Sequence, residues 1–226
     1  MPLILLALPL FLPAQATPLA EVVEAAADTG AARAMTPWDV ARLRSVADVA
    51  LSPDGEHVAY LLAIPRTEDE DDGGSWTELH VVPFDGGPSR AYVTGKGNVG
   101  SLAWRPGTIS ISFRQKRGDD KHSRVWLLPI DGGEAQPVTP EGEAAGGYKW
   151  SPDGSRLAWT KGADKGKGVK AREKAGHKQI VYEEDWLHTH LRLYTPGDEE
   201  SVVVDLGMSV QDFQWSPDGT QWAVAL

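Results

Sequence analysis

Apolar residues fall in short runs, often alternating with polar ones, and clusters of Gly, Pro and Asp separate these runs. One ten-residue phrase occurs three times, as LSPDGEHVAY at 51–60, WSPDGSRLAW at 150–159 and WSPDGTQWAV at 215–224. In such a phrase Pro presets φ for a turn, Asp can hydrogen-bond the backbone ahead of it, and Gly accepts positive φ. Each phrase therefore predicts a tight hairpin that joins two strands.

A second motif alternates with the first. LHVVPFDGGPSRAYVT at 79–94 matches VWLLPIDGGEAQPVT at 125–139, and LRLYTPGDEESVVVDL at 191–206 is a looser copy. Each copy reads as a strand, a turn built on Gly and Asp, and a second strand. Together the two motifs predict a repeating unit of four antiparallel strands.

The predicted units cover about 46–95, 98–140 and 145–206, and a partial unit begins at 209. In the second unit Arg105-Pro106-Gly107 keeps Pro and Gly but lacks the Asp. Four-stranded units at this spacing are typical of β-propeller blades. A sandwich or a meander is the alternative, but neither needs the same phrase at the same place in every unit. We therefore predict an all-β propeller over 37–226, incomplete at about three and a half blades.

Propellers close their ring with about four to eight blades, so we expect this chain to be a fragment of a longer protein. An open ring would expose the face of its last blade and a strand edge, which favours aggregation.

Composition narrows the function classes. The net charge is −10, which makes nucleic acid an improbable partner. The chain has no cysteine, which excludes disulfides and thiolate chemistry. Of its 9 tryptophans, Trp104, Trp150 and Trp215 come just before the repeat turns, and we expect these three in the core.

The N-terminus predicts export. Residues 2–13 are almost wholly apolar but too short to span a bilayer, and Ala-Gln-Ala follows at 14–16. We read 1–16 as a signal peptide, although its first residues lack Lys and Arg, and 17–36 as a linker. A buried helix is the alternative, and the prolines in this stretch argue against it. The expected location is secreted or periplasmic, with no membrane span elsewhere.

The stretch from 35 to 62, MTPWDVARLRSVADVALSPDGEHVAYLL, predicts a short helix over 37–44 followed by a strand. Thr36 can cap this helix, Pro37 suits its first turn, and Asp39 lies near the positive end of its dipole.

The repeats resemble the Asp-rich propeller repeats of the prolyl oligopeptidase family and of TolB-like periplasmic proteins. The residues that carry this resemblance are the Ser-Pro-Asp-Gly turns that begin at Ser52, Ser151 and Ser216. The stretch from 35 to 62 is similar to the entry of the propeller in acylaminoacyl-peptidase-like and dipeptidyl-peptidase-like members. The resemblance covers about residues 35–226, and the TolB-like proteins are the second choice.

In that family the propeller precedes an α/β-hydrolase domain, which holds the catalytic Ser, Asp and His. This sequence has no Gly-x-Ser-x-Gly nucleophile elbow, and Ser155 and Ser209 do not fit that pattern. The resemblance therefore implies a non-catalytic role, without cofactor or metal, in which the propeller admits or positions peptide substrates. It also implies a C-terminal hydrolase domain as partner. The rivals are a TolB-like scaffold that binds proteins and a stand-alone propeller formed by two paired fragments.

Glu183 and Glu184 are the candidate substrate-binding residues. The segment VYEEDW at 181–186 resembles a Tyr-Glu-Glu segment that binds the substrate's free amino terminus in dipeptidyl-peptidase-like members. Two carboxylates suit an ammonium group because several charge-assisted hydrogen bonds fix its position. Ordinary acids at a strand edge are the alternative.

Three further stretches have plainer interpretations. The basic, Gly-rich insert at 161–178 could bind an acidic partner, but a solvated loop is the simpler reading. His188 and His190 would share one face of a strand, yet two His without Cys are weak evidence for zinc. The acidic run at 67–74 lacks the alternating ligands of a calcium loop, so we predict a solvated loop there.

Overall fold

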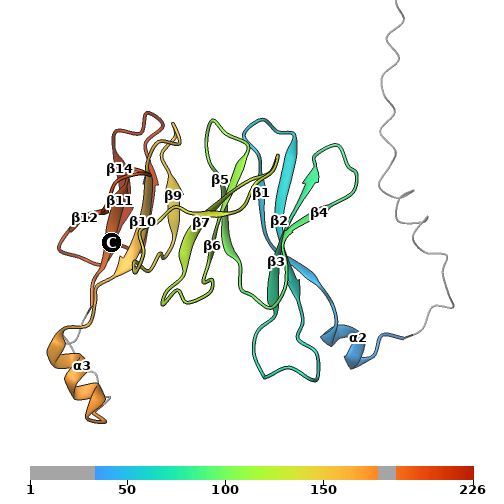
Figure 1. Ribbon diagram of the computed structural model, residues 1–226, viewed down its shortest axis with the longest axis horizontal. Helices are drawn as coiled ribbons and strands as arrows, with labels where there is room; N and C mark the ends of the chain where they lie inside the picture. The colour runs from blue at the N-terminus through green and yellow to red at the C-terminus, as the bar shows by residue number, and fades with distance from the viewer. Residues whose placement is uncertain (1–33, 178–186) are drawn as a thin grey trace, which may run out of the picture. The chain divides into compact units, whose positions relative to one another are not determined.

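The computed structural model describes residues 34–177 and 187–226 of the chain (Figure 1). The signal peptide predicted over 1–16, most of the linker predicted over 17–36, and Glu183 and Glu184 lie outside these residues. The chain divides into two units, 1–40 and 41–226, and every described strand belongs to the second.

The second unit consists of antiparallel sheets in which the strands follow one another in chain order. Sheet 1 contains β1 (Ser45–Leu51), β2 (His57–Ile64), β3 (Trp76–Pro83) and β4 (Arg90–Val93). Sheet 2 contains β5 (Gly100–Trp104), β6 (Ser110–Gln115), β7 (Arg124–Pro129) and β8 (Gln136–Pro137). Sheet 3 contains β9 (Tyr148–Trp150), β10 (Leu157–Gly162), β11 (Thr189–Tyr194) and β12 (Val202–Val204), and sheet 4 contains β13 (Asp212–Trp215) and β14 (Trp222–Ala225).

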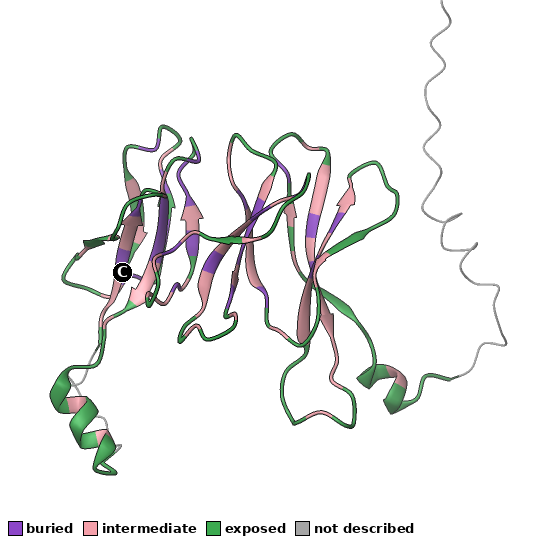
Figure 2. Cartoon of the chain, viewed as in Figure 1, coloured by how far each residue is buried: buried purple, intermediate pink, exposed green. Residues whose placement is uncertain are grey.

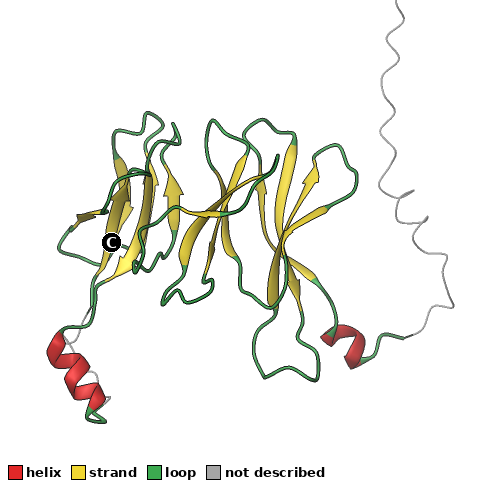
Figure 3. Ribbon diagram, viewed as in Figure 1, coloured by secondary structure: helices red, strands yellow, loops and turns green. Residues whose placement is uncertain are grey.

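Two helices, α2 (Pro37–Ala41) and α3 (Lys167–Lys174), complete the described elements (Figure 3). Helix α2 begins as predicted, because Thr36 Oγ1 accepts a hydrogen bond from the Asp39 amide at 3.3 Å, and Asp39 Oδ2 accepts one from the Thr36 amide at 2.8 Å. The helix predicted over 37–44 was too long. Ser45 already pairs with Ala63 in sheet 1, so the chain must leave the helix before that residue.

The Ser-Pro-Asp-Gly phrase recurs because its two polar side chains satisfy the backbone of the hairpin. In sheet 3, Ser151 Oγ accepts a hydrogen bond from the Arg156 amide at 2.9 Å and donates one to Asp153 Oδ1 at 2.5 Å. Asp153 Oδ1 also accepts a hydrogen bond from the Ser155 amide at 3.1 Å. The turns that begin at Ser52 and Ser216 contain the same three bonds. Because the Ser151 side chain is fully buried, its hydroxyl needs these partners.

These hydrogen bonds favour the ionised carboxylate in each turn. The Ser151 hydroxyl, followed by the hydroxyl and amide of Ser155, lowers the pKa of Asp153 well below its usual range. The pKa of Asp54 is lowered first by Ser52, and that of Asp218 first by Ser216.

Consecutive sheets pack against each other through layers of buried apolar side chains, which we call seams. Figure 2 shows buried residues along the strands of these sheets. Seam 1 lies between sheets 1 and 2 and includes Leu79 and Phe113, both fully buried. Seam 2 lies between sheets 2 and 3 and is built around Val125 and Trp159. Seam 3 joins sheet 3 to sheet 4, where Phe213 is buried. Most of the core therefore lies between sheets, as it does between propeller blades.

Tryptophan side chains link each sheet to the one before it. Trp104, Trp150 and Trp215 each end the first strand of a sheet and are only 7% exposed, which confirms their predicted place in the core. The Trp104 indole Nε1 donates to the Ala50 carbonyl at 2.9 Å, and Trp215 Nε1 donates to the Lys149 carbonyl at 3.3 Å.

In seam 2 the tryptophan is linked to the preceding sheet by two successive hydrogen bonds. Trp150 Nε1 donates to Ser112 Oγ at 2.9 Å, and Ser112 Oγ donates to the Ala103 carbonyl at 2.6 Å. Ala50, Ala103 and Lys149 all precede the last residue of the first strand in their sheets. In all three seams the indole N–H is therefore bonded to the carbonyl at the same strand position of the preceding sheet, either directly or through the Ser112 hydroxyl.

Arginine side chains join the turns of neighbouring sheets. Arg156 Nη2 donates to the Gly219 carbonyl at 2.7 Å, and its guanidinium lies 5.2 Å from the Trp215 ring centre. Arg105 makes the matching contacts one seam earlier, with its Nε 2.9 Å from the Gly154 carbonyl and its guanidinium 5.0 Å from the Trp150 ring. Arg105 comes from the turn that lacks Asp. It precedes Pro106-Gly107, whereas Arg156 follows its Ser-Pro-Asp-Gly turn, so two different turn positions supply the same contact. His57 stands where Arg156 does and packs on Trp104 with ring centres 6.5 Å apart.

The prediction of an all-β protein made of four-stranded antiparallel units is confirmed. Within the described residues the sheets do not close into a ring. Val46, Val49 and Leu51 on β1 remain more than half exposed. The number of blades in a closed ring stays a prediction.

We expect Gly154→Ala to lower the free energy of unfolding by about 2 kcal/mol more than Gly107→Ala. Both glycines have positive φ, +69° and +71°, so alanine is strained at either position. At Gly154 the added Cβ would also lie 2.3 Å from the Pro106 carbonyl oxygen, whereas at Gly107 nothing lies within 4 Å. Urea unfolding with unchanged m-values measures the difference. Equal shifts of the two unfolding midpoints would contradict this prediction, because they would show that the backbone near Pro106 moves away from the added Cβ at no cost in stability.

Acid should destabilise the protein through its turn aspartates. Because the folded-state pKa of Asp153 is depressed, its contribution is present above the unfolded pKa of about 3.9 and is lost as the pH falls below that value. Asp153→Asn should therefore show a shallower loss of stability between about pH 4 and pH 2 than the unsubstituted chain. Urea titrations across this range measure the slope. Asp131→Asn, at an exposed residue of the β7–β8 turn, controls for the removal of a surface carboxylate.

Candidate functional site

The long connections leave the sheets at one end (Figure 1). Because the strands alternate in direction, the β2–β3, β6–β7 and β10–β11 connections share an end with the links from one sheet to the next. The other end holds the short repeat turns. The long connections carry most of the charged side chains outside the sheets, so we searched this end for a binding site.

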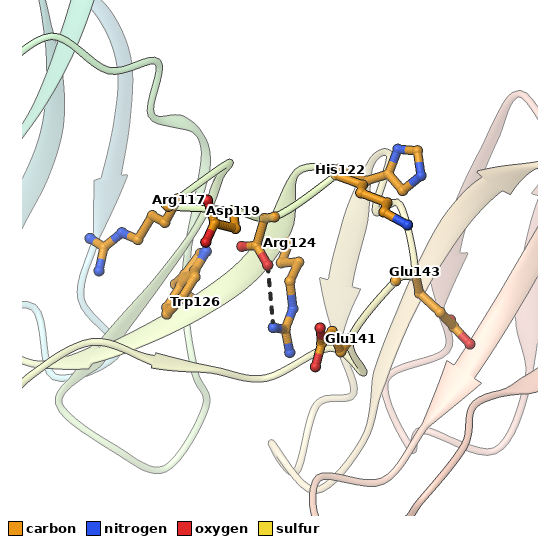
Figure 4. Close-up of a pocket in the computed structure, with 11 residues that line it drawn as sticks. Arg117, Asp119, His122, Arg124, Trp126, Glu141 and Glu143 are labelled. Atoms are coloured by element: carbon orange, nitrogen blue, oxygen red, sulfur yellow. Dashed lines mark ion pairs between the residues drawn. The ribbon is translucent and has the colours of Figure 1, made fainter.

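A pocket of about 500 Å³ opens at this end, between the β6–β7 connection and the link from β8 to β9 (Figure 4). Most of its side chains are charged. It is lined by Arg117, Gly118, Asp119, Asp120, Lys121, His122, Arg124, Trp126, Glu141, Gly142 and Glu143.

Trp126 supplies the aromatic surface of the pocket. Its Nε1 donates to the Gln115 carbonyl at 3.0 Å, which fixes the indole against β6. The guanidinium of Arg117 lies 4.7 Å from the Trp126 ring centre, and that of Arg124 lies 5.9 Å from it. These distances are in the range of cation–π attraction. Burial lowers the pKa of Arg117, and its Nε donates to Gln115 Oε1 at 2.6 Å.

Arg124 and Asp120 form the ion pair of the pocket. Their Nη1 and Oδ1 atoms are 3.6 Å apart, and Arg124 Nε donates to the Thr139 carbonyl at 3.2 Å (Figure 4). The other oxygen, Asp120 Oδ2, is buried and has no hydrogen-bond partner in the described part of the chain. An unpaired buried acceptor is costly, so this oxygen is suited to accept a hydrogen bond from a ligand.

Glu143 ties the pocket to sheet 3. It accepts a hydrogen bond from Ser201 Oγ at 2.8 Å and lies 3.5 Å from Arg192 Nη1. Its charge is therefore balanced by sheet 3. The pocket accordingly spans the gap between two sheets.

The chemistry of the pocket suits binding. It presents cations, carboxylates and one aromatic face, which can form ion pairs, hydrogen bonds and cation–π contacts with a charged ligand. The eleven lining residues include no Ser, Thr, Cys or Tyr, so no hydroxyl or thiol nucleophile lines it. The arrangement is suited to hold a charged ligand.

Among the described residues, neither of the histidines singled out from the sequence, His188 and His190, lines this pocket. Glu183 and Glu184 lie outside the described residues, so their role stays a prediction. His188 and His190 have different neighbours. His188 Nδ1 lies 3.4 Å from Ser209 Oγ, and His190 Nδ1 lies 3.5 Å from Asp205 Oδ1.

The basic insert differs from its prediction as a loop, because residues 167–174 form helix α3. Its Lys, Arg, Ala and Glu residues have good helix propensity, and glycines flank it at 166 and 176. The acidic run is a loop as predicted. Within this loop Glu70 differs from the predicted solvated acids. Its carboxylate accepts hydrogen bonds from Thr67, Lys96 and Trp76, which lower its pKa to about 2.

Sequence reasoning missed the pocket because a charged, Gly-containing stretch between two strands is typical of any exposed connection. It also missed a group formed by Asp54, Glu56 and His57, whose ligand-type atoms lie within 4.8 Å of one another. The turn explains this group, since Asp54 makes the bonds that Asp153 and Asp218 make. Among the described helices, none is long and apolar enough to cross a membrane.

The repeating four-stranded antiparallel sheets, packed one against the next, define a domain of the propeller class. No family model matches the chain. The uncharacterized peptidase YuxL of Bacillus subtilis is 26% identical over 150 residues, which cover 66% of this chain and 22% of that protein. Dipeptidyl-peptidase 5 of Porphyromonas gingivalis is 24% identical over 223 residues, which cover 88% of this chain and 32% of that protein. The chain thus spans between about a fifth and a third of these curated relatives.

Solved structures show the same fold. An acylaminoacyl peptidase in complex with Z-Gly-Gly-Phe-chloromethyl ketone matches 82% of this chain with a TM-score of 0.59 at 14% identity, over 28% of that chain. TolB from Acinetobacter baumannii matches 80% of this chain with a TM-score of 0.53 at 14% identity, over 37% of that chain. These likenesses confirm the resemblance predicted from the sequence, to peptidase propellers and to TolB.

Proposed function

We propose that this chain is the non-catalytic propeller part of a serine peptidase, and that it admits and positions peptides for an α/β-hydrolase domain. The observation that carries this proposal is the likeness to dipeptidyl-peptidase 5. It extends over 88% of this chain but only 32% of that enzyme, so it involves one part of a longer peptidase. The hydrolase domain would supply the Ser nucleophile and cleave peptides by acyl transfer.

Two features of the chain support this division of labour. Its sequence lacks a Gly-x-Ser-x-Gly elbow, and the residues that line its charged pocket include no hydroxyl or thiol side chain. A propeller that only binds needs neither. The apolar stretch at 2–13 and the Ala-Gln-Ala that follows support export, so the proposed location is secreted or periplasmic.

A TolB-like periplasmic scaffold is the second candidate. The fold match to TolB, with a TM-score of 0.53, favours it. In this case the domain would bind proteins, and no hydrolase domain would follow.

Sequencing the gene beyond the codon for Leu226 separates the two candidates. We expect the frame to continue through further four-stranded units into a Gly-x-Ser-x-Gly elbow, followed by Asp and His. The complete product should then hydrolyse dipeptidyl or acylaminoacyl naphthylamides, and replacing the elbow Ser by Ala should abolish turnover. The 226-residue chain alone should be inactive. A frame that completes a ring of blades and then stops would contradict the peptidase proposal and favour the scaffold.

Glu183→Ala/Glu184→Ala in the complete enzyme should raise KM for substrates with a free amino terminus by about tenfold or more, because a charge-assisted contact would be lost. Amino-terminally blocked substrates should be unaffected. Glu199→Ala/Glu200→Ala is a matched control, because it also removes two adjacent glutamates, which here are exposed in the β11–β12 turn. Steady-state kinetics with both substrate types make the comparison. Unchanged KM for free-amine substrates would exclude this role for the pair.

A further inference from the structure

The β1–β2 turn lacks one hydrogen bond that the other two Ser-Pro-Asp-Gly turns share. In the β9–β10 turn the hydroxyl of Ser155 donates to Asp153 Oδ2 at 2.7 Å, and in the β13–β14 turn the hydroxyl of Thr220 donates to Asp218 Oδ2 at 2.9 Å. The residue at this position of the β1–β2 turn is Glu56, whose ionised carboxylate has no hydrogen to donate. The turn therefore has a second carboxylate where its counterparts have a hydroxyl.

The two carboxylates of the β1–β2 turn, Asp54 and Glu56, are open to a cation. Asp54 Oδ1 accepts hydrogen bonds from the Ser52 hydroxyl and from the Glu56 amide, as in the other turns. Both acids are exposed, and no ion pair within the described residues includes either of them. Like charges at neighbouring positions repel each other, and a cation between them removes this repulsion.

The next position adds a histidine to the two acids. It is His57 in this turn, whereas the other two turns have Arg156 and Gln221 there. The ring atom His57 Nδ1 is buried and has no hydrogen-bond partner in the described part of the chain, although buried polar atoms usually have one. Ligand-type atoms of Asp54, Glu56 and His57 lie within 4.8 Å of one another. The turn explains why these groups meet, but its hydrogen bonds use only the Asp54 side chain.

A pocket of about 420 Å³ adjoins these side chains. The Phe84 amide donates to the Glu56 carbonyl at 2.8 Å, which holds the β3–β4 turn beside the β1–β2 turn. The Phe84 side chain is 65% exposed. The pocket therefore leaves room for an ion and for further ligands of that ion. It is lined by Gly55, Glu56, His57, Pro83, Phe84 and Asp85.

We propose that Asp54, Glu56 and His57 bind a divalent transition-metal ion of the Zn²⁺ type. Imidazole nitrogen and carboxylate oxygen are both common zinc ligands, with bonds of about 2.0–2.2 Å. Rotation of the exposed Glu56 side chain, with small movements of the other two side chains, closes the site around such an ion. Three protein ligands leave a further coordination position open toward the pocket.

The donor set determines the class of metal. Ca²⁺ and Mg²⁺ prefer sites made entirely of oxygen ligands, whereas an imidazole favours Zn²⁺ and its neighbours among the transition metals. Asp85 lines the same pocket and adds negative charge to the surroundings of the site, which attracts a cation. The proposed ion would neutralise the carboxylates and give the His57 ring a partner.

The site is separate from the charged pocket described above. It lies among the repeat turns, at the end of the sheets opposite the long connections. The proposal therefore goes beyond the proposed function, because it involves neither Glu183 and Glu184 nor the contact with a hydrolase domain.

Isothermal titration calorimetry of the full 226-residue chain with ZnCl₂ tests the proposal. The chain carries no affinity tag and is freed of metal with a chelator beforehand. We expect one Zn²⁺ to bind per chain with a dissociation constant in the micromolar range, and CaCl₂ to bind at least about tenfold more weakly. A chain that binds no Zn²⁺, or that binds Ca²⁺ equally well, overturns the proposal.

The variant Glu56→Thr/His57→Gln identifies the site. It gives the β1–β2 turn the two residues that the β13–β14 turn has at the same positions, so the hairpin keeps a sequence that already forms this turn. We expect its affinity for Zn²⁺ to fall by about tenfold or more, because two of the three ligands are removed. A cooperative urea transition in the absence of metal verifies that the variant is folded. Unchanged Zn²⁺ affinity overturns the assignment of the ligands.

The matched control is His177→Gln/Glu200→Thr, which removes one exposed histidine and one exposed glutamate elsewhere in the described chain. It should bind Zn²⁺ like the unsubstituted chain. A tenfold loss of affinity in this control would show that other side chains hold the ion, and it would overturn the assignment to the β1–β2 turn.

The β13–β14 turn allows the site to be transplanted. Thr220 and Gln221 are both exposed, so Thr220→Glu/Gln221→His places the same three ligand types around Asp218. Made in the variant that has lost the original site, this change should recover one Zn²⁺ per chain. Failure to recover binding would overturn the claim that these three ligands are sufficient. None of these measurements depends on peptidase activity, so they stand apart from the test of the proposed function.

Discussion

The indole N–H of the tryptophan that ends the first strand is the interaction on which the packing of the sheets depends. It lies within an otherwise apolar seam, where an unpaired donor is destabilising, so the preceding sheet must present an acceptor at the right place. Trp104 and Trp215 find a backbone carbonyl, and Trp150 finds the Ser112 hydroxyl, which passes the bond on to Ala103. The indole thus fixes both the distance and the register between consecutive sheets.

The sequence predicted the repeating part of this architecture well, because the repeat is local. Ser, Pro, Asp and Gly stand next to each other, and their mutual hydrogen bonds close the hairpin at Ser151 as the turn rules require. Contacts between sheets were harder to foresee. Arg105 replaces the contact that Arg156 makes elsewhere, although the two occupy different positions of their turns. Only the folded chain shows that equivalence.

The candidate site was outside the reach of sequence reasoning for a related reason. Its pocket depends on Asp120 from the β6–β7 connection and Arg124 at the start of β7 lying close to Glu141 and Glu143 from the link between β8 and β9, and no local sequence pattern encodes that proximity. Helix α3 was read as a loop because its sequence has no apolar periodicity, and within the described residues none of its side chains is buried. The repeat turns stabilise the hairpins at one end of the sheets, and the variable connections at the other end contain the charged residues that line the pocket.

The seams have a consequence for how stability is distributed. The three apolar clusters share no residue, and each seam is completed by contacts between immediate neighbours only. The energetics of such an array approach a sum over nearest-neighbour terms, as in a one-dimensional chain of coupled units. A whole sheet could then be duplicated, exchanged or lost with a change only in the two seams that it forms with its neighbours. Variation in the number of sheets is a natural form of divergence for such a chain.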